Sequence, residues 1–416
     1  MDARLKKALE ANREELVSTL QELIRHPSTK GNEESAQVCF AEKLRALGGD
    51  VDMWEPDIEA MRKIPHFYTD RESYKGSPVL AATFKGSGGG KSLILCGHMD
   101  VVPAVAEYWS MDPYAGILKD DRVYGRGAAD MKGGIAANFI ALKSILDAGI
   151  RLKGDVIVET SVDEEVGNTG ILALCQKYTA DAAIVPEPTA LEMNVATGGS
   201  RMYEISVPGK AAHVGTSYKG ENAIYKAIPL INAIRDLQER RRIRLMDPLY
   251  ADRPIPFCTG VTMIKAGEWR ATVPSEAVVT GRLGIAPSES MDDAMAELED
   301  AIMSQAGADP WLRENPPKIT YFPSLWQSGH IDVDHPLVRM IARNSREITG
   351  VEARVSGMSA CSDSGTLIKV GNVPAVNFGP NTMEMAHQND EFVDLPSLFA
   401  CADITAQTIV DFCGAE

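Results

Sequence analysis

The chain has 416 residues, an apolar fraction of 44% and a net charge of −16. The composition is typical of a soluble globular protein, and the length predicts two domains. The acidic balance excludes a nucleic-acid-binding face, which would need clustered basic residues. No apolar run is long enough to span a membrane, and the N-terminus shows no secretory signal.

Seven cysteines occur without a C-x-x-C pair. This usage indicates reduced thiols and a cytoplasmic protein rather than a disulfide framework or a thiolate zinc site.

The first half of the chain alternates between predicted helices and buried strands. Apolar spacing predicts helices over residues 5–24, 32–47, 135–149 and 168–178, and strands over 79–84, 93–96, 155–160 and 182–185. This alternation predicts an α/β fold with a mostly parallel, doubly wound sheet. Residues 61–74 form a polar, aromatic-bearing insertion with no clear periodicity.

The pattern changes near residue 198. Strands over 203–207, 258–264 and 277–285 and helices over 221–240 and 291–305 predict an inserted α+β sandwich with an antiparallel sheet. Charged residues 239–242 indicate a solvated helix end. The α/β pattern then returns with a helix over 336–349, a strand over 375–378 and a helix over 395–412. We therefore expect a discontinuous catalytic domain, 1–197 and 322–416, interrupted by a domain spanning 198–321.

Polar side chains that suit metal binding mostly follow the predicted strands. They are His98, Asp130, Glu164, Glu165, Glu187 and His387. Because parallel strands end at one edge of a sheet, we expect these side chains to gather there. Taken singly, each also has a simpler explanation: Asp130 would cap a helix, Glu187 would be a loop carboxylate, and the adjacent glutamates a solvated turn.

Two histidines and three carboxylates suit two divalent ions that share a bridging carboxylate, with Zn²⁺ favoured and Co²⁺ or Mn²⁺ as alternatives. Such ions acidify a water and polarise a carbonyl oxygen. Of Glu164 and Glu165, one would bind metal and the other would take the proton of the water. Asp100 would accept from the distal N–H of the His98 ring and fix its tautomer.

The chain contains six motifs in order, which are GHMDVVP, YGRGAADMKGG, DEEVGNTG, PEPT, GKAAHVG and AHQNDEF. Together they resemble the M20 metallopeptidases, a family that includes acetylornithine deacetylase, succinyl-diaminopimelate desuccinylase, aminoacylases and glutamate carboxypeptidase. The resemblance runs from about Thr83 to the C-terminus.

The resemblance implies a role for each metal-site residue. His98 and Glu187 would bind one ion, while Glu165 and His387 would bind the other. Asp130 would bridge the two ions and would precede a cis peptide bond. Glu164 would be the general base, and Asp100 would orient His98.

The resemblance also implies that residues 198–321 form a lid and dimerisation domain. His213 would enter the partner subunit's active site and stabilise the oxyanion. Arg282 would hold the substrate carboxylate. The loop from Gly357 to Gly365, with Ser362 and Asp363, would line the substrate pocket, although it is equally explained as a strand-to-helix turn.

Two positions depart from the family pattern. Ala271 precedes Thr272-Val273-Pro274 where many relatives have Asn, which puts one substrate contact in question. AHQNDEF lacks the Pro that relatives usually carry near its third position.

The expected activity is hydrolysis of the amide of N-acyl-L-amino acids by a homodimer that joins through the lid. A dipeptidase or carboxypeptidase on the same site is the alternative. A non-catalytic dimer that binds metal or an amino acid is an alternative of another class.

Overall fold

The structure, a computed structural model, describes residues 1–65 and 67–416 and contains two compact units. The first comprises Met1–Ala196, Gly329–Gly357 and Ser362–Glu416, and the second comprises Thr197–Ser328 and Met358–Cys361. Residue 66, inside the predicted insertion, lies outside the described residues. None of the described helices is long and apolar enough to cross a membrane. The catalytic and lid roles of the two parts remain predictions.

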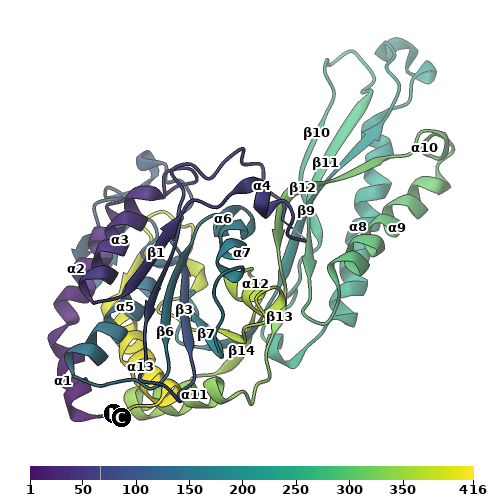
Figure 1. Cartoon of the computed structure of the whole chain (residues 1–416). Helices are drawn as coiled ribbons and strands as arrows, with labels where there is room; N and C mark the ends of the chain where they lie inside the picture. The colour runs from purple at the N-terminus through teal and green to yellow at the C-terminus, as the bar shows by residue number, and fades with distance from the viewer. Residues whose placement is uncertain (66) are drawn as a thin grey trace. The chain divides into compact units, whose positions relative to one another are not determined.

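A nine-stranded mixed sheet forms the centre of the first unit, in the order β1-β2-β6-β3-β7-β15-β8-β13 with β14 paired to β8 (Figure 1). Its strands are β1 (Asp50–Trp54), β2 (Val79–Phe84), β3 (Leu93–His98), β6 (Val156–Ser161), β7 (Ala182–Val185), β8 (Met193–Thr197), β13 (Gly329–His330), β14 (Val355–Met358) and β15 (Ala375–Asn377). The four central strands β6, β3, β7 and β15 are parallel. The α/β class is confirmed. The sheet is mixed because β1, β2 and β8 add antiparallel pairs outside this centre, where no crossover helix is needed.

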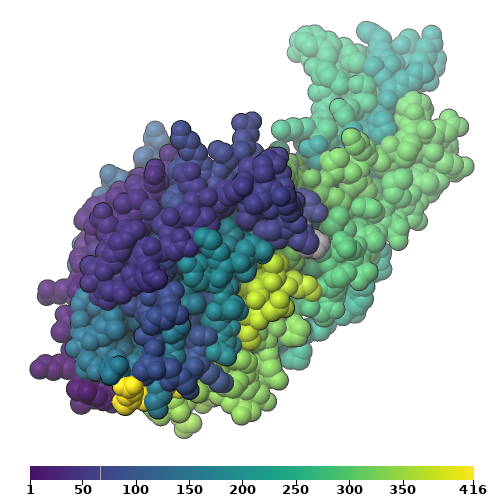
Figure 2. Space-filling model, in the orientation of Figure 1, coloured from purple at the N-terminus to yellow at the C-terminus, as the bar shows by residue number. Residues whose placement is uncertain are grey.

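Helices cover both faces of this sheet (Figure 1). The helices of this unit are α1 (Ala3–Ala11), α2 (Arg13–Ile24), α3 (Glu34–Ala46), α4 (Ile58–Met61), α5 (Lys132–Asp147), α6 (Glu164–Gly167), α7 (Thr169–Cys175), α11 (Pro336–Thr349), α12 (Asp363–Lys369) and α13 (Leu395–Cys413). Helices α5 and α13 pack on each other and on β3, and helices α7 and α12 pack on each other and on strands of the same sheet. Figure 2 shows purple N-terminal and yellow C-terminal residues sharing the surface of this discontinuous unit.

The predicted helix over 5–24 is two helices, separated at Asn12. The Nδ2 of Asn12 donates to Ser144 Oγ at 3.0 Å and to Asp147 Oδ2 at 2.9 Å, both near the end of α5. Both partners of Asn12 lie more than a hundred residues away in sequence. Helical spacing within residues 5–24 therefore could not predict the break.

A small antiparallel sheet links two distant segments of the first unit. Its strands are β4 (Ile117–Lys119), β5 (Arg122–Tyr124) and β16 (Phe392–Asp394), in the order β16-β5-β4. Pairing of β16 with β5 brings the segment that follows His387 beside the segment that leads to Asp130.

The second unit is a four-stranded antiparallel sheet in the order β10-β11-β9-β12, packed against helices α8 and α9. Its elements are β9 (Gly199–Pro208), α8 (Ala223–Arg244), β10 (Gly260–Ala266), β11 (Glu276–Ile285), α9 (Met291–Ala308), α10 (Pro310–Glu314) and β12 (Lys318–Trp326). Alternate residues of β9, among them Tyr203, Ile205 and Val207, enter its core. The predicted α+β sandwich is confirmed.

The expectation that residues 239–242 form a solvated helix end is wrong for Arg241. Its side chain is fully buried, and it donates to the carbonyl oxygen of Gly284 at 2.8 Å. Its guanidinium also pairs with Glu289 at 2.6 Å and Glu297 at 2.8 Å. Partners from β11, α9 and the connection between them satisfy this charge, which is how a buried arginine is tolerated.

Candidate metal centre

The parallel strands of the first unit place two of the predicted residues at one edge of the sheet. His98 is the last residue of β3, and its register partner on β6 is Ser161. Glu187 follows β7, which pairs with β3 on the other side. His98 and Glu187 are almost completely buried. The carboxyl ends of β3 and β7 therefore bring an imidazole and a carboxylate together, as parallel strand ends do.

His98, Asp130 and Glu187 form one cluster, whose ligand atoms all lie within 4.8 Å of one another. The Nε2 of His98 lies 3.0 Å from Asp130 Oδ1. The Nδ1 of the same ring lies 2.9 Å from the backbone oxygen of Asp100. A proton on Nδ1 directs Nε2 toward Asp130, which is the usual orientation of a metal-binding histidine.

The carboxylate of Asp100 was expected to accept from the His98 ring, but the acceptor is the backbone oxygen of Asp100. The backbone oxygen of Asp100 faces Nδ1, while the carboxylate oxygen Oδ1 lies 3.8 Å away. The carboxylate instead accepts the backbone N–H groups of Glu164 at 3.2 Å and Glu165 at 3.1 Å. Asp100 thus contacts both His98 and the turn that carries the two glutamates.

Asp130, Glu165 and His387 form a second cluster, again with ligand atoms within 4.8 Å of one another. The Nε2 of His387 lies 2.9 Å from Glu165 Oε2 and 3.6 Å from Asp130 Oδ2. One oxygen of Asp130 therefore faces each histidine, and the two clusters share this residue. Such an arrangement suits a carboxylate that bridges two ions.

The peptide bond between Asp130 and Met131 is cis, as the resemblance predicted. The backbone before it is held by Glu391, a fully buried carboxylate. Glu391 accepts the N–H groups of Ala129 at 2.9 Å and Asp130 at 3.0 Å and pairs with Arg126 at 2.6 Å. Glu391 and Arg126 were not among the predicted site residues, although they lie inside the motifs AHQNDEF and YGRGAADMKGG.

Glu164 and Glu165 begin α6, the short helix that follows β6. Asp163, just before them, has φ of 64°, a left-handed conformation that Asp tolerates better than most residues. Glu164 is 7% exposed, and burial raises its pKa well above the usual range. A carboxyl group with a raised pKa beside a metal site suits proton transfer near neutral pH.

The electrostatics of the two clusters fit divalent cations. Burial raises the pKa of Glu187, and the charge of Asp130 raises it further. Burial alone would raise the pKa of Asp130 too, but the hydrogen bond and charge of His98 outweigh it and lower that pKa. The hydrogen bond to Glu165 raises the pKa of His387. Two imidazoles and three carboxylates, with one carboxylate shared, would hold two divalent ions. The ions would replace the protons that the raised pKa values favour on Glu187 and His387.

The predicted substrate-binding residues lie in different environments. In the second unit, the Nε of Arg282 donates to Ser200 Oγ at 2.9 Å, and its Nη2 lies 3.7 Å from Cys361 Sγ. In the first unit, Ser362 caps α12, and Asp363 accepts from the hydroxyl of Ser161; both side chains are fully buried. Gly357 is a buried residue of β14. Their roles toward substrate remain predictions.

His213 is an exposed residue of the second unit. Its Nδ1 accepts the backbone N–H of Gly215 at 3.1 Å. This bond places the ring proton of a neutral imidazole on Nε2, which is then a hydrogen-bond donor.

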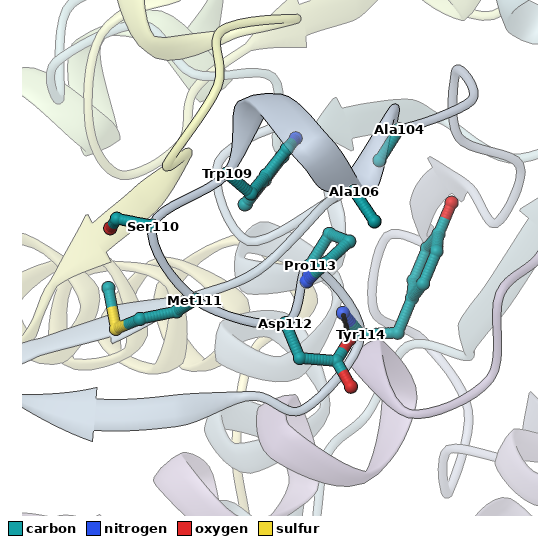
Figure 3. A pocket seen from close by; sticks show the side chains of 8 residues that line it. All are labelled: Ala104, Ala106, Trp109, Ser110, Met111, Asp112, Pro113 and Tyr114. Carbon is teal, nitrogen blue, oxygen red and sulfur yellow. Dashed lines mark hydrogen bonds between the residues drawn. The ribbon is translucent and has the colours of Figure 1, made fainter.

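A hollow of about 450 Å³ lies on the surface beside η1 (Ala106–Tyr108) of the first unit. Ala104, Trp109, Met111, Pro113 and Tyr114 are among the side chains around it (Figure 3). The backbone N–H of Ser110, also on its wall, donates to Asp390 Oδ1 at 2.8 Å, which ties this loop to the segment of His387. None of the predicted site residues lines the hollow.

Comparisons with known proteins agree with the motifs. A sequence model of peptidase family M20/M25/M40 matches residues 94–411. The chain is 28% identical to N-formyl-4-amino-5-aminomethyl-2-methylpyrimidine deformylase of Halalkalibacterium halodurans, over 97% of this chain and 96% of that protein. It is 30% identical to acetylornithine deacetylase of Myxococcus xanthus, over 81% of this chain and 84% of that protein.

Two solved structures share the fold. A tripeptidase of Staphylococcus aureus superposes with a TM-score of 0.74 at 22% identity, over 97% of this chain and 99% of that one. A dinuclear metal-binding peptidase of Bacillus subtilis superposes with a TM-score of 0.65 at 15% identity, also over 97% and 99%. Since the family model matches well over half of the chain, this protein belongs to peptidase family M20/M25/M40, whose members are hydrolases that act on amide bonds.

Proposed function

We propose that this protein is a dinuclear-metal-dependent deacylase that hydrolyses the amide of N-acyl-L-amino acids. The observation that carries the proposal is Asp130, whose two carboxylate oxygens face His98 and His387 in two separate ligand clusters. The two curated relatives support the deacylase reading, because both are named for removing an acyl group, formyl in one and acetyl in the other.

Divalent ions at the two clusters would polarise the amide carbonyl and acidify the attacking water. Glu164 would take the proton of that water and return it to the leaving amine, a task suited to its raised pKa. Glu165 and Glu187 would bind one ion each. Zn²⁺ suits the mixed nitrogen and oxygen ligands best, with Co²⁺ or Mn²⁺ as substitutes.

Arg282 would hold the carboxylate of the amino acid. Among the described residues, the guanidinium contacts a hydroxyl and a thiol but no carboxylate, so its charge is available to a carboxylate of the substrate. His213 would donate its Nε2 proton to the developing oxyanion. We further propose that the protein is a homodimer through the second unit. Each copy would then place its His213 in the active site of the other copy.

Replacement of Glu164 by Gln tests the catalytic proposal. The variant keeps the size of the side chain but has no carboxylate to accept a proton, so we expect kcat to fall by about 10² to 10⁴. Metal content measured by elemental analysis should stay at the parent value. Assays should use N-formyl, N-acetyl and N-succinyl amino acids and dipeptides with added Zn²⁺ or Co²⁺.

The matched control is Glu347→Gln, which removes an exposed carboxylate of α11 and should leave kcat unchanged. A Glu164→Gln variant with the parent rate would refute the proposed mechanism. Preference for dipeptides over acyl amino acids would favour the dipeptidase alternative. Hydrolysis of no amide in the panel, by a parent that binds metal, would favour a non-catalytic protein.

A further inference from the structure

Arg71, in the segment between α4 and β2, has a buried side chain that binds the residue directly before Glu164. The side chain of Arg71 is 6% exposed. Its Nε donates to Asp163 Oδ2 at 2.7 Å and Oδ1 at 2.8 Å, and its Nη2 donates to Oδ1 at 2.5 Å. The same guanidinium donates to Glu33 at 2.6 Å and to Ser77 at 2.7 Å. All of these groups belong to the first unit.

The Arg71 contacts hold the start of the turn that carries Glu164 and Glu165. Asp163 directly precedes them in its left-handed conformation. Tyr74, from the same segment, holds the other end of the turn. Its hydroxyl donates to Thr169 Oγ1 at 2.6 Å, and Thr169 Oγ1 donates to Asp163 Oδ2 at 2.8 Å.

The turn is thus bound from two directions. The Asp100 carboxylate accepts the backbone N–H groups of Glu164 and Glu165. Arg71 binds the side chain of Asp163. With Asp163 released, a left-handed non-glycine residue could relax to a commoner conformation and rotate the glutamates that follow it.

We propose that Arg71, assisted by Tyr74, is a positioning residue that directs Glu165 toward the second ligand cluster and Glu164 toward the reacting water. The inference rests on the proposed function for the roles of these two glutamates. Residues that orient metal ligands typically contribute a factor of 10 to 100 in metal affinity or activity. Residues 67–78 would then belong to the catalytic machinery, although none of them is in either ligand cluster.

Arg71→Met keeps the length of the side chain and removes its charge and hydrogen bonds. We expect the second Co²⁺ ion to bind 10 to 100 times more weakly when the metal-free protein is titrated and followed by cobalt absorption. In the metal-saturated enzyme kcat should fall by a similar factor, while KM stays within about twofold. Arg71→Lys should recover part of kcat, since it restores one charged donor.

Arg71→Met leaves Glu33 and Asp163 buried without their shared cation, so we expect the variant to lose stability. Tyr74→Phe is the milder probe, because it removes one hydroxyl from the same turn; we expect a two- to fivefold loss of kcat. Asp70→Asn is the matched control. It breaks the exposed ion pair of Asp70 with Lys30 in the same segment and should change neither cobalt affinity nor kcat.

Parent-like cobalt affinity and kcat in folded Arg71→Met or in Tyr74→Phe would overturn the inference and leave the proposed function standing. Failure of the parent itself to bind two cobalt ions would overturn the proposed function and this inference together. Asp70→Asn defects as large as those of Arg71→Met would also overturn the inference, because they would show a general effect of the segment.

Discussion

Glu159 is a carboxyl group buried inside the central sheet. It lies on β6, pairs in register with Cys96 of β3, and is 1% exposed. Neither of its carboxylate oxygens has a hydrogen-bond partner among the described residues. Burial, helped by the charge of Asp363, raises its pKa from 4.5 to about 8. The folded protein therefore keeps Glu159 protonated at neutral pH.

This buried proton makes stability depend on pH. Between pH 4.5 and 8 the unfolded chain releases the Glu159 proton while the folded chain keeps it, so ionisation favours unfolding as the pH rises. The contribution reaches at most about 1.4 kcal/mol per pH unit. We expect Glu159→Gln to lose less free energy of unfolding than the parent between pH 5.5 and pH 8, measured by urea denaturation. Glu347→Gln should follow the parent; equal slopes in the parent and Glu159→Gln would contradict the expectation.

The metal-site candidates could be named from the sequence because each signal is local. His98 and Glu187 directly follow apolar runs whose ends must meet at one sheet edge. Glu391 and Arg71 carry no such signal, since their partners lie far away in the chain. The acceptor for the His98 ring was predicted wrongly because a carboxylate and its own backbone oxygen compete within one residue.

Helix α5 begins unusually close to the strand end that carries Glu187. A Cβ on Gly134 would lie 2.2 Å from the carbonyl oxygen of Pro186, the residue before Glu187. Such a contact cannot be accommodated without moving the helix or the strand end. The absence of a side chain at Gly134 thus allows α5 to approach the site.

Two glycine-to-alanine variants in helices should have effects of opposite sign. Gly134→Ala should lower the free energy of unfolding by about 1–3 kcal/mol through the clash with Pro186. Gly307→Ala, in α9, meets no atom within 4 Å and should raise it by about 0.5–1 kcal/mol, because alanine favours the helix. Thermal and urea unfolding of both variants measure this. A stabilising Gly134→Ala would show that the close approach is not needed.

At the scale of elements, long periodic segments were predictable and short contacts were not. Helices α8, α9 and α13 follow their apolar spacing closely. The break at Asn12 and the antiparallel strands at the sheet edges depend on partners that meet only after folding. Arg241 is buried for the same reason, since β11, α9 and the link between them supply its acceptors.

Large apolar side chains are exposed on the second unit. They are Val214, Tyr218, Tyr225, Ile228, Met263, Ile264 and Trp269. Met263 and Ile264 lie on β10, which is an edge strand of its sheet. Exposed apolar groups beside an unpaired strand edge are typical of a surface that another chain covers. They support the proposed homodimer.

Charges introduced on α8 should separate the two copies. Tyr225 and Ile228 lie one turn apart and are 70% and 48% exposed. We expect Tyr225→Glu combined with Ile228→Glu to shift the protein from dimer to monomer in sedimentation equilibrium and to lower kcat while metal content is unchanged. Val351→Glu, at a 69% exposed site of the first unit, should stay dimeric. A fully active monomer would refute the proposal that His213 of one copy acts in the active site of the other.

Strand β15 lies inside the large sheet, between β7 and β8, yet β7 ends at Val185 and β15 starts only at Ala375. On a ribosome that adds roughly 5–20 residues per second, β7 would emerge roughly ten to forty seconds before its neighbour is synthesised. During that interval the nascent sheet has an open edge that other chains can pair with. The second unit, whose strands and helices are contiguous apart from four residues, can fold in the meantime. We therefore expect the newborn first unit to be prone to wrong strand pairing until its final segment is synthesised.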